Sequence, residues 1–110
     1  MTNRVANKDA RRYVQNLEEF QGSNTYAEWR NMPDGSQRYI VCSYGPHWPL
    51  FIYDNERWYE NADKVSVSTS KHHGKLHPMR ETEKHSADDM QEIARYGITG
   101  WVARTLGKAV

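Results

Sequence analysis

The stretch RYIVCSY, residues 38–44, decides how this chain folds. Its residues are mostly β-branched or aromatic, which is typical of a strand inside a sheet. A turn precedes it, because Pro33 presets one backbone φ and Gly35 accepts the positive φ that follows. Before the turn, residues 26–30 alternate between apolar and polar side chains. The two segments are therefore predicted to pair as a hairpin.

Further strands follow on the C-terminal side of this hairpin. Pro46 and Pro49 interrupt the ladder, because neither can donate a backbone hydrogen bond. Residues 50–53 then resume as a third strand and residues 57–60 form a fourth, with a turn between them. A polar edge strand near residues 65–69 is the fifth candidate. We therefore expect an antiparallel meander of four to five strands.

Helical patterns lie on both sides of the strands. Apolar residues recur every three to five positions over residues 5–20, which predicts an amphipathic helix that ends at Gly22. Ser86 begins a capping-box pattern, which predicts a helix over residues 86–97. A second short helix over residues 99–107 follows it directly.

Together these elements predict an α+β fold in a single domain over residues 1–110. The length suits one hydrophobic core, and the chain contains no internal repeat. We expect the N-terminal helix, the meander and then a C-terminal helical pair packed on one face of the sheet. Residues 70–85 contain hardly any apolar anchor and are predicted to form an exposed loop.

Charge and composition exclude several classes of protein. The formal net charge is +1, unlike an acidic mimic of DNA or a strongly basic nucleic-acid binder. The first residues contain no apolar signal-peptide core, and the longest apolar runs are too short to span a bilayer. Cys42 is the only cysteine, so no intramolecular disulfide can form. We expect a cytoplasmic protein with no membrane partner.

The histidines between residues 72 and 85 invite a metal-site interpretation. Zinc needs about four ligands that converge tetrahedrally. Here the spacing is irregular, and Gly74 and Pro78 prevent the helix that would bring two imidazoles together. We interpret this tract as an exposed polar loop, and we expect no metal and no other cofactor.

No catalytic residue is predicted, and the sequence favours a protein that is not an enzyme. Cys42 lies in the middle of a strand, on the face of Ile40 and Tyr44, where a free cysteine behaves as a small hydrophobe. A helix-turn-helix is disfavoured, because Ala94 and Gly97 are three residues apart and that motif needs four.

The middle of the chain resembles a family of small proteins encoded by tailed bacteriophages. The resemblance rests on residues 39–53, on the Trp-Tyr-Glu-Asn segment from residue 58, and on the Thr-Ser-Lys-His segment over residues 69–72. Cys42 and Val65 depart from the family pattern, in which tyrosine is common at both places. The resemblance implies a phage accessory protein in the cytoplasm of the bacterial host; the family has no assigned activity, so the resemblance implies a source and little about mechanism.

Two functions remain open at this stage. The leading hypothesis is a non-enzymatic protein that binds a host protein, for host takeover or evasion of defence. Its predicted contacts are mostly aromatic, because aromatic residues contribute to interfaces out of proportion to their number. They are Tyr44, His47, Trp48, Trp58, Tyr59, Lys71 and His72.

The alternative hypothesis is a nucleic-acid-binding module. It would hold phosphates with the basic loop and stack bases on exposed aromatic rings. Its predicted phosphate contacts are Lys64, Lys71, Lys75 and Arg80. A homodimer is compatible with either hypothesis if an aromatic edge strand stays uncovered.

Overall fold

Strand β4 (Gln37–Ser43) lies at the centre of a seven-stranded sheet. The computed structural model describes residues 3–22, 24–31, 35, 37–43, 48–63 and 76–108. Side chains of β4 alternate between the two faces of the sheet, and all of those from Tyr39 to Cys42 are fully buried. This explains why residues 39–42 are all apolar, because both faces of the sheet are covered.

The sheet order follows the chain, from β1 to β7. The five strands from β2 to β6 pair antiparallel, so the predicted meander is confirmed for its central strands. The two outer strands, β1 and β7, pair parallel to their neighbours, so the prediction of a purely antiparallel sheet is wrong. The bounds of the strands other than β4 are β1 Asn3–Arg4, β2 Phe20–Gln21, β3 Thr25–Asn31, β5 Pro49–Asp54, β6 Arg57–Asn61 and β7 Thr82–His85.

Helix α1 (Asn7–Gln15) is shorter than the predicted helix over residues 5–20. The chain leaves the helix at Leu17, which has a φ of 57°, and Phe20 already belongs to β2. Gly22 does not cap the helix. Its N–H instead donates to the carbonyl oxygen of Thr25 at 2.7 Å, within the turn from β2 to β3.

The first core cluster lies between α1 and one face of the sheet. It consists of Ala10, Val14, Phe20, Ala27, Tyr39, Val41, Leu50, Phe51, Trp58 and Leu76. The hydroxyl of Tyr39 donates to the carbonyl oxygen of Glu18 at 2.6 Å, and the indole N–H of Trp29 donates to that of Leu17 at 2.8 Å. Both donors fasten the segment after α1 to the sheet.

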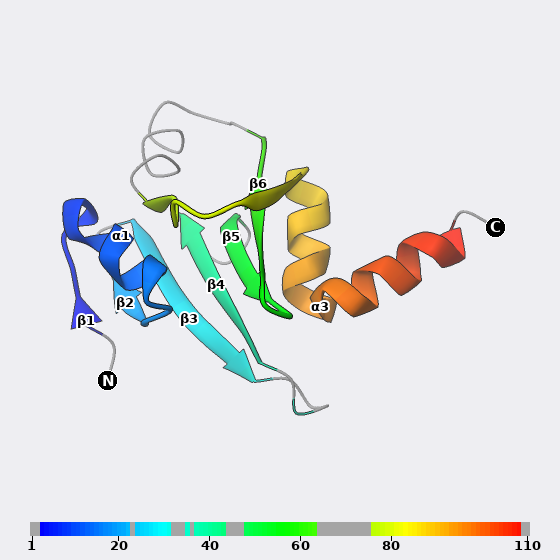
Figure 1. Cartoon of the computed structure of the whole chain (residues 1–110), viewed down its shortest axis with the longest axis horizontal. Helices are drawn as coiled ribbons and strands as arrows, with labels where there is room; N and C mark the ends of the chain where they lie inside the picture. Colours follow the sequence, from blue (N-terminus) through cyan, green and yellow to red (C-terminus); the bar gives the residue numbers. More distant parts are fainter. Residues whose placement is uncertain are drawn as a thin grey trace.

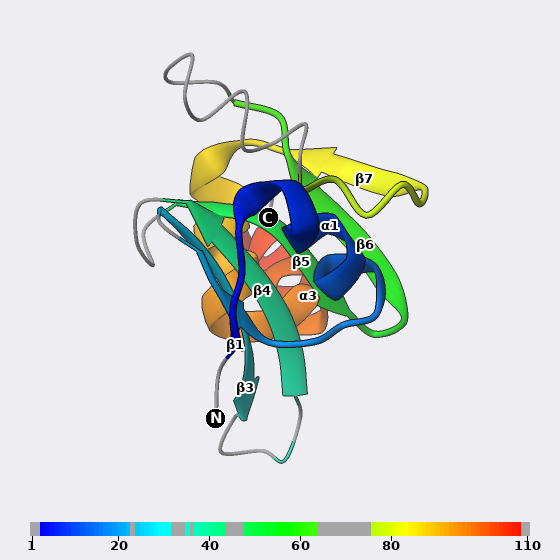
Figure 2. The ribbon, with the colours of Figure 1, turned by 90° about the vertical axis from the view of Figure 1, so that its left-hand side faces the viewer.

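Helix α3 (Ala87–Lys108) covers the opposite face mainly with its first half, together with Ile98 and Trp101 just beyond its middle. The N–H of Asp89 donates to Ser86 Oγ at 3.2 Å, so the predicted capping residue is confirmed. The second core cluster consists of Ile40, Cys42, Ile52, Tyr59, Met90, Ile93, Ala94 and Ile98. Figures 1 and 2 show α1 and α3 on opposite sides of the sheet.

A sharp bend divides α3 at Gly97, where φ is 77° and ψ is 165°. Arg38 Nη1 donates to the carbonyl oxygens of Ala94 and Arg95, at 3.1 and 3.3 Å. On the other side of the bend, Asp54 Oδ2 accepts the N–H of Ile98 at 2.8 Å. The ends of both helical segments are thus capped by side chains of the sheet. We call Arg38, Asp54 and Gly97 the latch.

Beyond the bend, residues 98–108 form a segment that we call the arm. Figure 1 shows the arm running away from the sheet, towards the C-terminus. The prediction that both C-terminal helices pack on one face therefore holds for the first helix and, in the second, only for Trp101 near its start, because Val102 and Leu106 are exposed. The latch explains the difference, because it directs the arm outward.

The predicted exposed loop over residues 70–85 differs from the structure in its second half. Leu76 is fully buried in the first core cluster, and Thr82–His85 form β7. Residues 70–75 lie outside the described residues, as does the predicted strand near residues 65–69.

Candidate functional site

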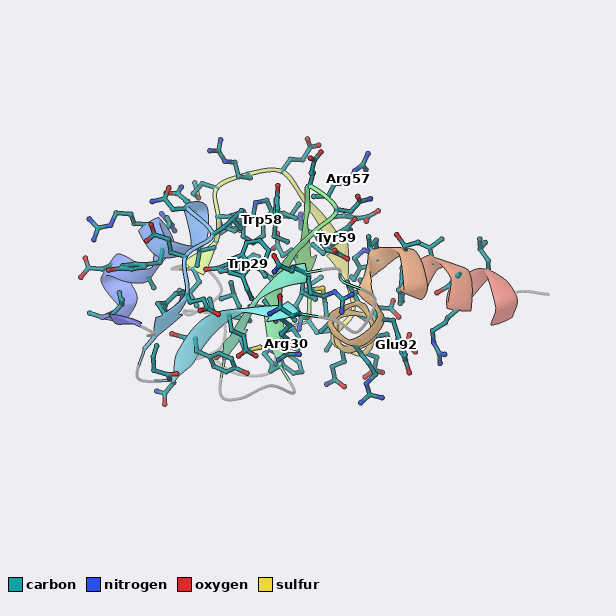
Figure 3. The ribbon with its side chains drawn as sticks, turned by 90° about the horizontal axis from the view of Figure 1, so that it is seen from below. Trp29, Arg30, Arg57, Trp58, Tyr59 and Glu92 are labelled. Atoms are coloured by element: carbon teal, nitrogen blue, oxygen red, sulfur yellow. The ribbon has the colours of Figure 1, made fainter. Side chains whose placement is uncertain are left out.

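The first wall of the candidate site is the tight turn between β5 and β6. Asn55 and Glu56 have φ values of 53° and 63°, and positive φ at both central residues is the mark of a type I′ turn. This turn leaves Glu56 and Arg57 exposed. Figure 3 shows Arg57 at the periphery, whereas Trp58 and Tyr59 lie within the body on opposite sides of β6.

The floor of the site is the indole ring of Trp58. Its ring centroid lies 5.2 Å from that of Tyr53 and 6.2 Å from that of Tyr39, and both contacts run edge to face. Trp58 is 8% exposed, so most of the ring belongs to the first core cluster. The floor is therefore fixed by packing before any ligand arrives.

The second wall is the segment over residues 80–83, which leads into β7. The parallel register pairs Thr82 with Trp58, so residue 80 comes level with residue 56 of the first wall. The hydroxyl of Thr82 donates to Glu60 Oε1, and His77 Nε2 lies 3.3 Å from the same oxygen. Glu60 is 5% exposed. A buried carboxylate on β6 thus fixes this wall at two points.

Between the two walls lies a hollow with a volume of about 730 Å³, which we call the cleft. This volume falls within the range of sites that bind small molecules or short segments of polypeptide. Among the described residues that line it, two arginines and three glutamates give a net formal charge of one negative. The lining residues are Tyr53, Glu56, Arg57, Trp58, Arg80, Glu81, Thr82 and Glu83.

Most of these charges lack an ion-pair partner within the described part of the chain. This holds for the guanidinium groups of Arg57 and Arg80 and for the carboxylates of Glu56 and Glu81. Glu83 differs, because its Oε2 lies 3.2 Å from His85 Nε2. The cleft therefore offers free charges of both signs to a ligand.

Among the described residues that line the cleft there is no cysteine and no histidine; two of them, Tyr53 and Thr82, carry a hydroxyl, and that of Thr82 already donates to Glu60. Elsewhere, burial raises the pKa of Cys42 to about 11, so this thiol is protonated at neutral pH. Across the described ranges, no group of three or more His, Cys, Asp or Glu side chains is placed to hold a metal ion.

The structure brings together two predicted site residues that belonged to different hypotheses. Trp58, a predicted protein contact, and Arg80, a predicted phosphate contact, both line the cleft. Tyr59 is 2% exposed and packs on the opposite face, and Trp48 is half-buried against the first core cluster. The predicted residues that lie outside the described ranges are Tyr44, His47, Lys64, Lys71, His72 and Lys75.

Sequence reasoning missed most of the lining of the cleft. The turn before Arg57 was recognised, and its two-residue length could have indicated that Glu56 and Arg57 point outward. The second wall gave no such signal. Strand β7 reads Thr-Glu-Lys-His, which contains no apolar alternation, and its parallel partner lies more than twenty residues earlier.

Comparison of this chain with protein-family models, with curated proteins and with solved structures gives no match. Among the described residues, no helix combines the length and the apolar character needed to cross a membrane. The geometry and the charges of the cleft are therefore the basis for a functional proposal.

Proposed function

We propose that this protein binds another protein and that the cleft is the contact surface. The observation that carries the proposal is the presence, in one preformed cleft, of free charges of both signs beside the edge of a buried tryptophan. Arginine and aromatic residues dominate the energetics of protein interfaces. A segment of polypeptide that carries both acidic and basic side chains matches this lining.

The rigidity of the cleft supports the same proposal. One wall is a two-residue turn, and the other is held by Glu60 through Thr82 and His77. Walls that are already ordered reduce the entropy that is lost when a partner binds. The cleft thus resembles a preorganised contact surface rather than a surface loop that would have to be ordered.

The three glutamates of the cleft weigh against the nucleic-acid alternative. Affinity for nucleic acid rests mainly on contacts between basic side chains and phosphates. In the cleft, Glu56, Glu81 and Glu83 would face those phosphates together with Arg57 and Arg80. Protein binding is therefore the better supported of the two functions.

The resemblance to phage-encoded proteins extends the proposal to the partner. We propose that the partner is a protein of the bacterial host, bound in the host cytoplasm, and that the contact serves host takeover or evasion of defence. The cleft contributes the physical basis for binding, and the resemblance contributes the source of the partner.

Affinity capture from bacterial host lysate tests this proposal. The full chain serves as bait, alongside a variant that carries Arg57→Glu and Arg80→Glu. We expect the wild type to retain a specific protein, and we expect the variant to retain at least about tenfold less, because arginine is enriched among the few residues that dominate interface energy and the variant reverses two such charges. Half of each lysate is treated with nuclease.

A matched control carries Arg12→Glu and Arg95→Glu, two exposed positions away from the cleft with the same total change of charge. It should behave as the wild type. Equal retention by the cleft variant would show that the cleft is not the contact surface. Retention that disappears with nuclease, together with binding to single strands that falls steeply with salt, would favour the nucleic-acid alternative.

A further inference from the structure

His77 lies just before the second wall of the cleft, and both nitrogens of its ring have partners. The backbone N–H of Met79 donates to His77 Nδ1 at 2.9 Å. On the other side of the ring, Nε2 lies 3.3 Å from Glu60 Oε1. A neutral imidazole has one donor nitrogen and one acceptor nitrogen, so the contact with Met79 places the ring proton on Nε2. His77 is therefore neutral in this geometry, and its Nε2 donates to Glu60.

Packing fixes the orientation of this ring. Its centroid lies 5.3 Å from that of Phe51 in β5, and the contact runs edge to face. Glu60 is the charged group that faces the ring from β6. Helix α1 contributes the uncharged Gln15, whose Nε2 donates to the carbonyl oxygen of Pro78 at 3.2 Å. The side chain of His77 is itself 27% exposed, so solvent can deliver a proton to the ring.

Met79 has a backbone conformation that its residue type disfavours. Its φ is 57°, in the left-handed region that glycine favours. Pro78 suits the second position of a type II turn, and the third position of such a turn usually takes glycine. The Met79 side chain is 62% exposed, so its burial does not offset this strain. The hydrogen bond to His77 Nδ1 holds the strained residue, and Arg80 of the cleft follows it directly.

We propose that His77 makes the second wall of the cleft sensitive to protons. We call the hydrogen bond from the Met79 N–H to His77 Nδ1 the clasp. An imidazolium carries a proton on both nitrogens, so Nδ1 can no longer accept the Met79 N–H. Nε2 keeps its proton, and its contact with Glu60 becomes a charge-assisted hydrogen bond. Protonation thus keeps His77 on β6 and opens the clasp, which releases Met79 and Arg80.

The consequence for binding rests on the function proposed above for the cleft. Histidine changes its charge between about pH 5 and 8, so the clasp is closed at the upper end of this range and open at the lower end. Thr82 still donates to Glu60, so only the start of the wall is released. A released wall must be ordered again when a partner binds, which costs affinity. The partner should therefore bind more weakly at acidic pH.

Nuclear magnetic resonance of the full chain, labelled with ¹⁵N, tests the clasp without a partner. At pH 8 we expect His77 Nδ1 to be unprotonated and Nε2 to be protonated. As the pH falls to 5, the ring should take up a proton, and the amide resonances of Met79 and Arg80 should shift with the same midpoint. A ring that carries its proton on Nδ1 at pH 8, or stays neutral at pH 5, would overturn the proposal. So would protonation of the ring without a shift at Met79.

Two substitutions of His77 separate the two contacts of the ring. In His77→Asn, the side-chain oxygen can accept the Met79 N–H at every pH, so the Met79 and Arg80 resonances should stay in place between pH 8 and 5. In His77→Gln, the longer amide can donate to Glu60 but leaves Nδ1 without a substitute, so the clasp should already be open at pH 8. Circular dichroism checks that each variant is folded.

The matched control is His85→Gln, which removes a second histidine whose ring also lies beside a glutamate, at 3.2 Å from Glu83. It should keep the pH-dependent shift at Met79 and Arg80. A shift of equal size in His77→Asn would show that another group causes it, and this result would overturn the proposal.

The effect on the cleft is measured with a captured partner at pH 8 and pH 5. From pH 8 to pH 5 the wild type should lose at least about threefold more affinity than His77→Asn, the effect expected for one hydrogen bond. Equal losses would overturn the regulation of the cleft by His77. Failure to capture a partner at either pH would instead contradict the proposed function, and the resonance titration would still decide whether the clasp exists.

Discussion

At the scale of single residues, Arg38 stands out because its charged side chain is buried and must be satisfied by hydrogen bonds. It is buried at the start of β4, and its guanidinium caps two carbonyl oxygens of α3. Its Nε lies 3.9 Å from Asp54 Oδ2, which adds a charge interaction to the hydrogen bonds. Nothing in the sequence around residue 38 indicates burial, because arginine beside a turn is usually exposed.

Arg38→Met tests how strongly this residue stabilises the fold. The change leaves the carboxylate of Asp54, which is only 13% exposed, without its counter-charge and frees two helix-end carbonyls. We expect the free energy of unfolding to fall by about 3 kcal/mol. Arg30→Met is the control, since Arg30 pairs with Glu28 at 2.8 Å on a partly exposed surface, and it should cost less than about 1 kcal/mol. Chemical denaturation measures both, and equal losses would contradict the role of the latch.

At the scale of elements, the strands with a strong pattern were predictable and the others were not. Strand β4 is apolar on both faces, so its place at the centre of the sheet could be predicted from its own residues. Strand β7 is polar and is held by parallel pairing to β6, a contact that leaves no local pattern. Gly97 correctly predicted the end of a helical segment. The direction of the arm depends on Arg38 and Asp54, which are distant in sequence, so it could not be predicted.

The candidate site shows the same division. Trp58 and Arg80 could be singled out from their residue types, and the structure places both at the cleft. Their proximity could not be predicted, because it depends on the register between β6 and β7. Tyr59 is a predicted contact residue that the structure instead buries under α3. Its residue type alone does not reveal which face of the strand meets this helix.

Gly97→Ala tests whether the bend requires glycine. An added Cβ would lie 2.6 Å from Arg38 Nη2, and the φ of 77° is strained for alanine. We expect a loss of about 1 to 3 kcal/mol in the free energy of unfolding. Gly107→Ala is the control in the same helix, because nothing lies within 4 Å of its added Cβ. It should be neutral or slightly stabilising, and denaturation followed by circular dichroism compares the two.

At the scale of the whole molecule, one sheet separates two cores that both hold buried weak acids. Burial raises the pKa of Cys42 to about 11, and it also raises the pKa values of Tyr26, Tyr39 and Tyr59. All four groups must stay protonated in the folded state. Deprotonation of these groups at high pH would therefore destabilise the packing on both faces of the sheet.

Stability should consequently fall at alkaline pH. The unfolded chain releases the proton of Cys42 near its ordinary pKa of 9.0, whereas the folded chain keeps it to about 11. Between these values the unfolded state binds fewer protons, so the free energy of unfolding decreases as pH rises. We expect Cys42 to contribute about 1 kcal/mol of this decrease by pH 10. Urea denaturation at several pH values measures it, and Cys42→Ala should show a shallower decrease above pH 9.

The latch also determines how the direction of the arm could be changed. Arg38 precedes Ala94 by 56 positions, and Asp54 also lies in a strand, so the direction of residues 98–108 is set by side chains of the sheet and not by the helix itself. Substitutions in β4 and β5 would steer the arm while its own surface stayed unchanged. The surface of the arm and the angle at which the arm leaves the sheet can thus vary independently.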